Sequence, residues 1–292
     1  MNIFATLPPA DAKVEAVFRY MDTLPYSERQ AYLANNLNCK VQRLYKYRPL
    51  DPASADSISR VHDIIVAGRL WLSSPLDFND PFDLTAQSVF EGTREEKKAR
   101  LQILIDEKAA NLSPRKRREM VAKILAQPID AMTANVHDAS TRSMESCGLY
   151  CLAGDPLSIL MWSHYGHHHT GICLRFDVAK DPTSMTAAVP VKYTTEYPVI
   201  NWPLNGTETL RDALYSKFAD WRYEQEYRIM VPDGRHKYLP IKPEAVDSII
   251  LGCRATTDTQ AAVEKSLMNE FAENCRRWNC TAQRGTTENT NL

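Results

Sequence analysis

Short apolar strands and amphipathic helices follow one another along most of the chain. Residues 54–67 set isoleucine and valine side chains at helical spacing, begin with serine and aspartate residues suited to capping, and are followed by Gly68. Short apolar and aromatic runs flank this helix and predict strands at 43–50 and 69–74. The order strand, helix, glycine, strand predicts a compact unit near the start of the fold.

The same patterns predict the remaining elements. Further strands are expected at 148–154, 170–178, 189–194, 226–231 and 247–252, and further helices at 156–166, 210–218 and 257–275. Strands and helices do not alternate strictly, so a mixed, mainly antiparallel sheet fits better than a doubly wound parallel one. The predicted fold class is α+β.

Composition divides the chain into a core with additions. Helical spacing interrupted by Pro25 predicts an N-terminal helical cap over residues 1–40. The highly charged residues 91–145 predict a helical insertion within a catalytic-like α+β domain that spans 41–255. Residues 256–292 add a C-terminal helix and a polar tail.

Charge and cysteine content narrow the class of protein. A formal net charge of −1 over 292 residues gives the whole chain no bias toward nucleic acid or an anionic membrane. It has neither a membrane-spanning apolar run nor a secretion signal, so we expect a cytoplasmic protein with no membrane partner. Seven cysteines predict reduced thiols. A zinc site formed by Cys147, Cys151 and the histidines after them is less favoured than reduced thiols, because the sequence lacks two close pairs of ligands at the spacing typical of zinc sites.

The segment YEQEYRIMVP at 223–232 is the strongest chemical cue. In an extended backbone, residues two apart point to the same side, so Glu224 and Glu226 would face one pocket. Two carboxylates held that close need a cation, or a site that uses them. The alternative is that the two carboxylates are exposed at the end of the strand and form ion pairs with Arg222 and Arg228.

A second cue is MWSHYGHHH at 161–169, which is dense in hydrogen-bond donors and aromatic rings. We expect Trp162 to pack against the sheet. His164 and Tyr165 follow the apolar helix face, where a histidine is more often a supporting hydrogen-bonded residue than a base. The histidines after them are expected to form a solvated turn.

The first strand supplies cations. Lys46 and Arg48 share one of its faces, and Tyr45 and Tyr47 share the other. A basic face beside a carboxylate pair is what the phosphates and ribose of a dinucleotide require. We therefore expect the first strand to lie next to the glutamate pair.

The loop SPLDFNDPFD at 74–83 follows the strand that ends near Ser73 and Ser74. Asn79 and Asp80 are turn formers that bond their own backbone, which favours a structural role. Elsewhere the chain contains no GxGxxG, no GxxxxGK[ST], no GxSxG and no HExxH. The sequence therefore gives no support for a Rossmann dinucleotide site, a P-loop, the nucleophile elbow of an α/β-hydrolase or a zincin metalloprotease.

Four segments in order, LYKYRPL, SSPLDFNDPFD, MWSHYGHHHTGICLRF and DWRYEQEYRIM, resemble the bacterial family catalogued as domain of unknown function 2971, over roughly residues 43–255. A more distant resemblance is to the ADP-ribosyltransferase superfamily. It rests on a first strand with a polar residue, a helix ending in glycine, a strand ending in serine, and a late Glu-x-Glu before an apolar strand.

This second resemblance implies roles for several residues. Lys46 or Arg48 would hold NAD, and Ser73 or Ser74 would support the nicotinamide ribose. Glu226 would act on that ribose, while Glu224 would orient the acceptor. The rest of the NAD pocket is expected to include Tyr47, Asn79, Asp80, Trp162, His164, Tyr165 and Arg228.

The expected function is that of an NAD-dependent ADP-ribosyltransferase, with NAD as substrate. Such a protein would be a toxin-like or phage-defence effector that modifies a protein or nucleic acid, and an inhibitor or antitoxin protein is a further expected partner. The alternatives are a non-catalytic nucleotide- or partner-binding module and an NAD glycohydrolase. A metal-dependent nuclease using Asp80, Asp83 and the glutamates ranks lowest, since their spacing is not that of a known metal site.

Overall fold

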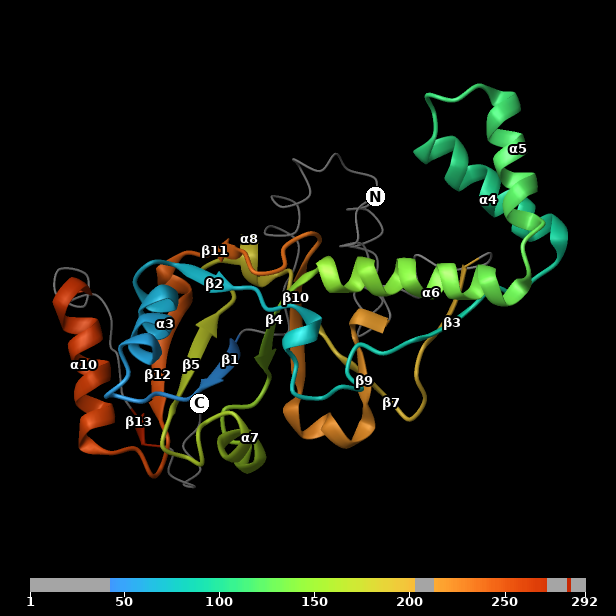
Figure 1. Ribbon diagram of the computed structural model, residues 1–292. Coiled ribbons are helices and arrows are strands. Elements are labelled where there is room, and N and C mark those ends of the chain that lie inside the picture. The colour runs from blue at the N-terminus through green and yellow to red at the C-terminus, as the bar shows by residue number, and fades with distance from the viewer. Residues whose placement is uncertain (1–42, 203–212, 272–282, 285–292) are drawn as a thin grey trace. The chain divides into compact units, whose positions relative to one another are not determined.

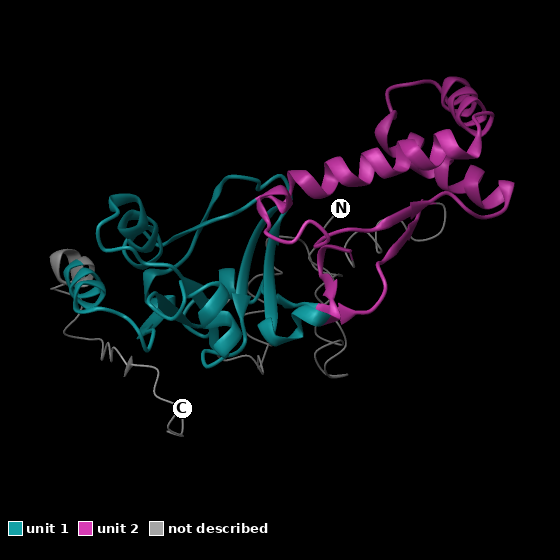
Figure 2. Ribbon diagram, turned by 60° about the horizontal axis from the view of Figure 1, so that its bottom comes forward, with its two compact units in different colours: residues 1–73, 148–191, 220–292 teal, residues 74–147, 192–219 magenta. Residues whose placement is uncertain are grey.

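The computed structural model describes residues 43–202, 213–271 and 283–284 (Figure 1). The N-terminal cap expected at 1–40 lies outside these residues. Two compact units divide the chain (Figure 2). Unit 1 takes the described parts of residues 1–73, 148–191 and 220–292, and unit 2 takes those of residues 74–147 and 192–219.

Unit 1 is built on a seven-stranded sheet with the order β13-β12-β5-β1-β4-β10-β6. Its strands are β1 (Arg43–Arg48), β4 (Gly148–Ala153), β5 (Ile172–Asp177), β6 (Val189–Pro190), β10 (Glu226–Val231), β12 (Val246–Leu251) and β13 (Gln283–Arg284). Within this sheet β12 and β13 run parallel, and the other neighbouring strands are antiparallel. The predicted α+β class with a mainly antiparallel sheet is confirmed.

Apolar side chains cover both faces of this sheet. On one face the main core includes Leu44, Phe176 and Ile64, together with residues of α3 (Ala55–Ile65), α8 (Pro182–Met185) and α10 (Thr257–Phe271). On the other face Tyr47 packs against Trp162 of α7 (Ile159–His164). Each fully buried leucine or phenylalanine contributes about 1.5–3 kcal/mol. These two layers hold β1, β4 and β10 at the centre of unit 1.

Helix α3 begins and ends as predicted. The Ser54 hydroxyl accepts a hydrogen bond from the Ser57 amide at 3.3 Å, which caps the helix. After the helix, Gly68 has a φ of +58°, and a Cβ there would lie 2.6 Å from the Ile241 carbonyl oxygen. Glycine is therefore required at this turn. It leads into β2 (Arg69–Trp71), which pairs with β11 (Tyr238–Pro240) ahead of η3 (Pro243–Ala245).

Unit 2 is mostly helical. Three helices lie in the segment predicted as a helical insertion, namely α4 (Arg94–Lys108), α5 (Pro114–Leu125) and α6 (Ile129–Ser146). The unit also holds η1 (Pro75–Asp77), the parallel pair β3 (Gln87–Val89) and β8 (Val199–Asn201), and the parallel pair β7 (Lys192–Thr194) and β9 (Ser216–Phe218). A buried ion pair joins the Lys217 ammonium to the Asp83 carboxylate at 3.3 Å.

Two element predictions need correction. Residues Ser216–Phe218, predicted as the end of a helix, form β9, because β7 offers them a partner strand that no local pattern reveals. The single strand predicted at 189–194 is divided between β6 in unit 1 and β7 in unit 2. The short strands β3, β8 and β11 were not predicted. Among the described residues, no helix has the length and apolar character needed to cross a bilayer.

Candidate functional site

The Glu-Gln-Glu segment forms a turn at the start of β10. Glu224 ends the 3-10 helix η2 (Ala219–Glu224), Gln225 has a φ of +43°, and Glu226 begins the strand. The Gln225 carbonyl accepts a hydrogen bond of 2.9 Å from the Gly154 amide, which ties the turn to the end of β4. The expected extended backbone is therefore wrong. Both glutamates are nevertheless buried, with 3% and 4% exposure.

Glu226 is held by the guanidinium of Arg228. The Arg228 Nε and Nη2 atoms donate to the two Glu226 carboxylate oxygens at 2.7 and 3.2 Å, and the arginine is completely buried. The two residues lie two apart on β10 and so share one face. Removing one partner of such a buried pair costs about 3–5 kcal/mol, since the other charge stays desolvated. The alternative was that the glutamates are exposed and are paired with Arg222 and Arg228. It is wrong about the exposure of the carboxylates, but it correctly names Arg228 as a partner.

Glu224 meets the end of α7. The Tyr165 hydroxyl donates to Glu224 Oε1 at 2.7 Å. The His164 ring is exposed, and its centroid lies 6.1 Å from that of Tyr223 and 6.5 Å from that of Tyr165. Histidine and tyrosine rings therefore gather beside a buried carboxylate.

Trp162 packs against the sheet, as expected. It is 6% exposed, and its ring meets that of Tyr47 edge-on with centroids 5.0 Å apart. The indole Nε1 donates to the Pro156 carbonyl at 2.9 Å, and the Tyr47 hydroxyl donates to the Asp155 carbonyl at 2.7 Å. Both aromatic residues therefore support the loop between β4 and α7.

The strand register determines which side chains share a face. Tyr45 is paired with Ala153, and Ala153 is paired with Glu226, so the side chains of these three residues lie on the same face. Lys46 and Arg48 alternate with Tyr45 and therefore leave β1 toward the other face. The expectation that the basic face lies beside the carboxylate pair is wrong for this reason.

Lys46 nevertheless reaches back into the sheet. The ladder between β1 and β4 consists of the single pair Tyr45–Ala153, whereas β1 and β5 pair over six residues. The Lys46 ammonium donates to the Cys151 carbonyl at 2.7 Å and lies 4.7 Å from the centroid of the Tyr150 ring. Burial lowers the pKa of Lys46, and the carboxylates of Glu226 and Glu224 are among the charges that oppose this shift. The ammonium is therefore held at β4, the strand that pairs with β10.

Further polar groups lie near the part of β1 and β4 where the two strands are not paired. Ser73 exchanges two backbone hydrogen bonds with Leu149 of β4, at 2.9 and 2.8 Å. Arg48 Nε and the Tyr150 hydroxyl are buried, and the Arg48 guanidinium interacts with that hydroxyl. Burial raises the pKa of Tyr150 to about 12, and the charge of Arg48 opposes the shift. We call Lys46, Arg48, Ser73 and Tyr150 the β1–β4 group.

The nearby thiols are unsuited to nucleophilic chemistry. Burial, and after it the Glu226 carboxylate, raises the pKa of Cys151. Burial also raises the pKa of Cys173. A thiol with a raised pKa is rarely a thiolate at neutral pH, and the thiolate is the nucleophile. Within the described residues, no three His, Cys, Asp or Glu side chains cluster so as to hold a metal ion.

Three predicted site residues lie in unit 2. Ser74 is completely buried and caps η1, where its hydroxyl accepts from the Leu76 amide at 3.2 Å. Asp80 accepts from the Phe82 amide at 2.9 Å, which is the local turn contact expected of an aspartate. Asn79 is exposed. Local structure accounts for Ser74 and Asp80, and neither belongs to the unit that carries the glutamates.

The histidines after α7 form an unusual turn. His167, His168 and His169 have φ values of 50°, 53° and 68°, in the left-handed region that side chains with a Cβ rarely adopt. The first two are exposed, which confirms the expected solvated turn. The His169 amide donates to the Trp162 carbonyl at 3.1 Å, so the turn closes against α7.

Sequence reasoning missed Tyr150 and Tyr223. Tyr150 is a hydroxyl-bearing residue inside the apolar strand GLYCLA, and that position was the available signal. Tyr223 precedes Glu224 in the quoted motif, but no spacing rule points to its contact with His164.

Comparison with known proteins finds one family. Residues 161–229 match the family model described as "Protein of unknown function (DUF2971)". No curated protein matches the chain, and no solved structure matches it. The matched span runs from α7 to β10 and contains the Tyr165–Glu224 and Glu226–Arg228 contacts. Across this span, where both buried glutamates lie, the chain is similar to the DUF2971 family.

Proposed function

We propose that this protein is an NAD-dependent ADP-ribosyltransferase in which Glu226 is the essential carboxylate. One observation carries the proposal. Two buried glutamates flank the turn at the start of β10, and the completely buried Arg228 guanidinium holds one of them in place. Burying a charged acidic group costs several kcal/mol. Such groups are therefore found mainly at functional sites, where the charge is used.

The reaction fits a fixed carboxylate. As the bond between nicotinamide and the ribose C1′ breaks, the ribose gains positive charge and nicotinamide leaves as a neutral molecule. A carboxylate hydrogen-bonded to a ribose hydroxyl stabilises that charge as it forms. Arg228 holds Glu226 in one orientation, so little reorganisation is needed. The acceptor, oriented by Glu224, then forms a bond to C1′ and releases a proton to the solvent.

The β1–β4 group supplies the remaining roles in this proposal. Lys46 or Arg48 binds the pyrophosphate, because cationic side chains form charge-assisted bonds to phosphate oxygens. Ser73 is preferred to Ser74 as the ribose contact, since the Ser74 hydroxyl caps η1. Tyr165 positions Glu224 through its hydroxyl.

The acceptor is proposed to be a protein or nucleic acid, as for a toxin-like or phage-defence effector controlled by an inhibitor or antitoxin protein. Water as the acceptor would make the protein an NAD glycohydrolase. The two activities differ in product. One yields an ADP-ribosylated macromolecule, and the other yields free ADP-ribose.

A second candidate is a non-catalytic nucleotide- or partner-binding module. The bidentate Glu226–Arg228 contact favours it, since both carboxylate oxygens already accept hydrogen bonds. The register favours it too, because Lys46 and Arg48 leave β1 on the face opposite Glu226. Such a module would bind NAD or another nucleotide without releasing nicotinamide.

Nicotinamide release separates the candidates. The full-length protein is incubated with NAD, with and without cell extract, beside three variants. Glu226→Gln tests the carboxylate. The double variant Glu226→Gln with Arg228→Gln keeps a polar pair without leaving one charge buried alone. Glu244→Gln, at an exposed glutamate, is the matched control.

We expect release from the wild type and from Glu244→Gln. The folded double variant should be slower by about 10²–10³-fold, the range for loss of one transition-state contact. Equal rates in the wild type and the folded double variant would refute the role of Glu226. NAD binding without release in any extract would support the module.

A further inference from the structure

The two-stranded ribbon formed by β2 and β11 in unit 1 exposes aromatic rings on one face. Its ladder pairs Trp71 with Tyr238 and Leu70 with Leu239. Both leucines pack in or against the main core of unit 1. Because side chains alternate along a strand, Trp71 and Tyr238 lie on the opposite face, where they are 41% and 43% exposed. Positions that usually carry polar side chains on a solvated face therefore carry large rings.

A third ring, that of His236, joins these two. The Trp71 and His236 rings are nearly parallel with centroids 5.8 Å apart, and the Tyr238 ring meets that of Trp71 edge-on at 5.0 Å. The Tyr238 hydroxyl donates to the Asp63 carboxylate at 3.0 Å, and the Arg69 guanidinium lies 4.2 Å from the centroid of the Tyr238 ring. We call Trp71, His236 and Tyr238 the ring cluster. These contacts hold its rings in a fixed arrangement at the surface.

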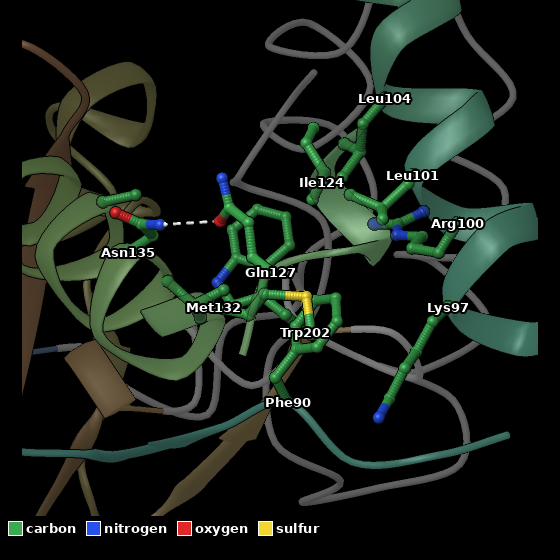
Figure 3. Close-up of a pocket in the computed structure, with 12 residues that line it drawn as sticks. Phe90, Lys97, Arg100, Leu101, Leu104, Ile124, Gln127, Met132, Asn135 and Trp202 are labelled. Atoms are coloured by element: carbon green, nitrogen blue, oxygen red, sulfur yellow. Dashed lines mark hydrogen bonds between the residues drawn. The ribbon is translucent and has the colours of Figure 1, made fainter. Parts of the chain in front are cut away.

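The aromatic rings of unit 2 are placed differently. Figure 3 shows Phe90 and Trp202 in the wall of an apolar pocket of about 280 Å³. The Trp202 indole donates to the Ser140 hydroxyl at 3.0 Å, and Phe90 is buried. These rings pack within their own unit, as aromatic side chains commonly do. The ring cluster instead presents contiguous ring surface to the solvent, which is typical of a binding surface.

Cations accompany the ring cluster. Arg235 and Lys237 are exposed and stand on either side of His236 in the turn before β11, which also contains one acidic residue, Asp233. Exposed rings interleaved with basic residues are typical of proteins that hold single-stranded nucleic acid, since bases stack on the rings and phosphates bind the cations. Phosphates recur along a flexible strand, so such a ligand does not require the cations to converge on one point.

We infer that this surface binds single-stranded nucleic acid, with bases stacked on the ring cluster and phosphates on Arg235 and Lys237. The bases of a duplex are stacked on one another and are not offered to the rings. A neutral carbohydrate or peptide would gain nothing from the two cations. The inference does not depend on the proposed transfer of ADP-ribose.

Fluorescence anisotropy with labelled oligodeoxythymidylate of about ten nucleotides tests the inference on the full-length protein. The single strand should bind at least about fivefold more tightly than the duplex of the same length, the lower end of the effect of one base–ring stack. The logarithm of its association constant should fall with the logarithm of salt concentration at a slope of about −1.4, as two phosphate contacts require. Equal affinity for the two forms would overturn the inference. So would binding of phosphatidylserine vesicles but not of the oligonucleotide.

Ring variants place the bases. Trp71→Ala should weaken binding of the single strand by at least about fivefold, whereas Trp71→Phe, which keeps a ring, should retain most of it. Tyr197→Ala removes a similarly exposed ring outside the ring cluster and is the control that should bind as the wild type does. Circular dichroism confirms that each variant is folded. Unchanged binding by folded Trp71→Ala would refute the site.

Charge variants place the phosphates. Arg235→Gln with Lys237→Gln should bring the salt slope close to zero and keep the preference for the single strand over the duplex. Arg115→Gln with Lys116→Gln, at exposed cations of α5, is the matched control and should leave the slope unchanged. A slope that is lost in the α5 variant and kept in the Arg235, Lys237 variant would assign the phosphates to α5 and overturn the inference.

Discussion

Each unit contains a buried ion pair, but the two pairs join residues at different separations along the chain. In unit 1 the Glu226 carboxylate and the Arg228 guanidinium come from one strand, and Glu224 accepts from Tyr165 nearby. In unit 2 the Lys217 ammonium lies 3.3 Å from the carboxylate of Asp83, which belongs to a distant segment of the chain. Both pairs are costly to separate, but the first fixes a carboxylate beside a second buried acid, whereas the second ties two distant segments together. Catalysis is therefore proposed for the first region alone.

The largest expected effect comes from separating the buried ion pair. Arg228→Met should lower the free energy of unfolding by about 3–5 kcal/mol, because Glu226 would remain buried without its guanidinium. Urea denaturation measures the change. Arg222→Met, at an exposed arginine of the neighbouring η2, is the control and should change stability by less than about 0.5 kcal/mol. A loss below about 1 kcal/mol in Arg228→Met would mean that the pair is solvated.

A smaller loss is expected at the other glutamate. Tyr165→Phe removes a hydroxyl that donates to Glu224 and should cost about 1–3 kcal/mol, the penalty for a buried acceptor that loses one donor. The same denaturation assay checks it. Tyr197→Phe, at an exposed tyrosine, should be neutral. Comparable stability for the two variants would indicate that water replaces the lost contact.

The pH dependence of stability should report Lys46. Its pKa is lowered in the folded protein from an ordinary value of 10.5, mainly by burial. The unfolded chain therefore holds the proton at pH values where the folded chain begins to lose it, and stability rises with pH. The loss of stability caused by burying the charged Lys46 side chain is fully present below its lowered pKa and is absent above pH 10.5.

Comparison with Lys46→Met isolates this effect. The free energy of unfolding of the wild type, relative to that variant, should increase as the pH is raised toward 10.5. Urea titrations at several pH values measure the difference. A difference that is flat, or that falls with pH, would show that Lys46 keeps an ordinary or raised pKa.

The smallest effect is expected in the histidine turn. His168→Gly should stabilise the protein by up to about 1 kcal/mol, because glycine adopts a φ of 53° without a Cβ clash. His164→Gly, in α7, should instead destabilise it by up to about 1 kcal/mol. Thermal unfolding of both variants checks the two signs. Destabilisation by His168→Gly would mean that its imidazole makes contacts that outweigh the strain.

Local patterns predicted many of the elements but not the geometry of the site. Helix α3 was predicted from Ser54, its apolar spacing and Gly68, because capping and periodicity are properties of neighbouring residues. The Glu-Gln-Glu segment was recognised, but its geometry was not, since the positive φ of Gln225 depends on a hydrogen bond from Gly154, 71 positions away in the sequence.

Long-range pairing explains the other differences. Sequence alternation placed Lys46 and Arg48 on one face of β1 correctly, but it could not reveal that Glu226 is in register with Tyr45 through Ala153. Strand β9 was mistaken for a helix for the same reason, because its partner is β7. Register between distant strands is set by the whole sheet, and no local window contains it.

Transfer of labelled ADP-ribose is the most direct test of the proposed chemistry. The full-length protein is incubated with cell extract and NAD carrying a radioactive phosphate, and label in the macromolecular fraction is counted. The account predicts labelling by the wild type and a loss of about 10²–10³-fold in the folded Glu226→Gln, Arg228→Gln variant. Undiminished labelling by that variant would contradict it.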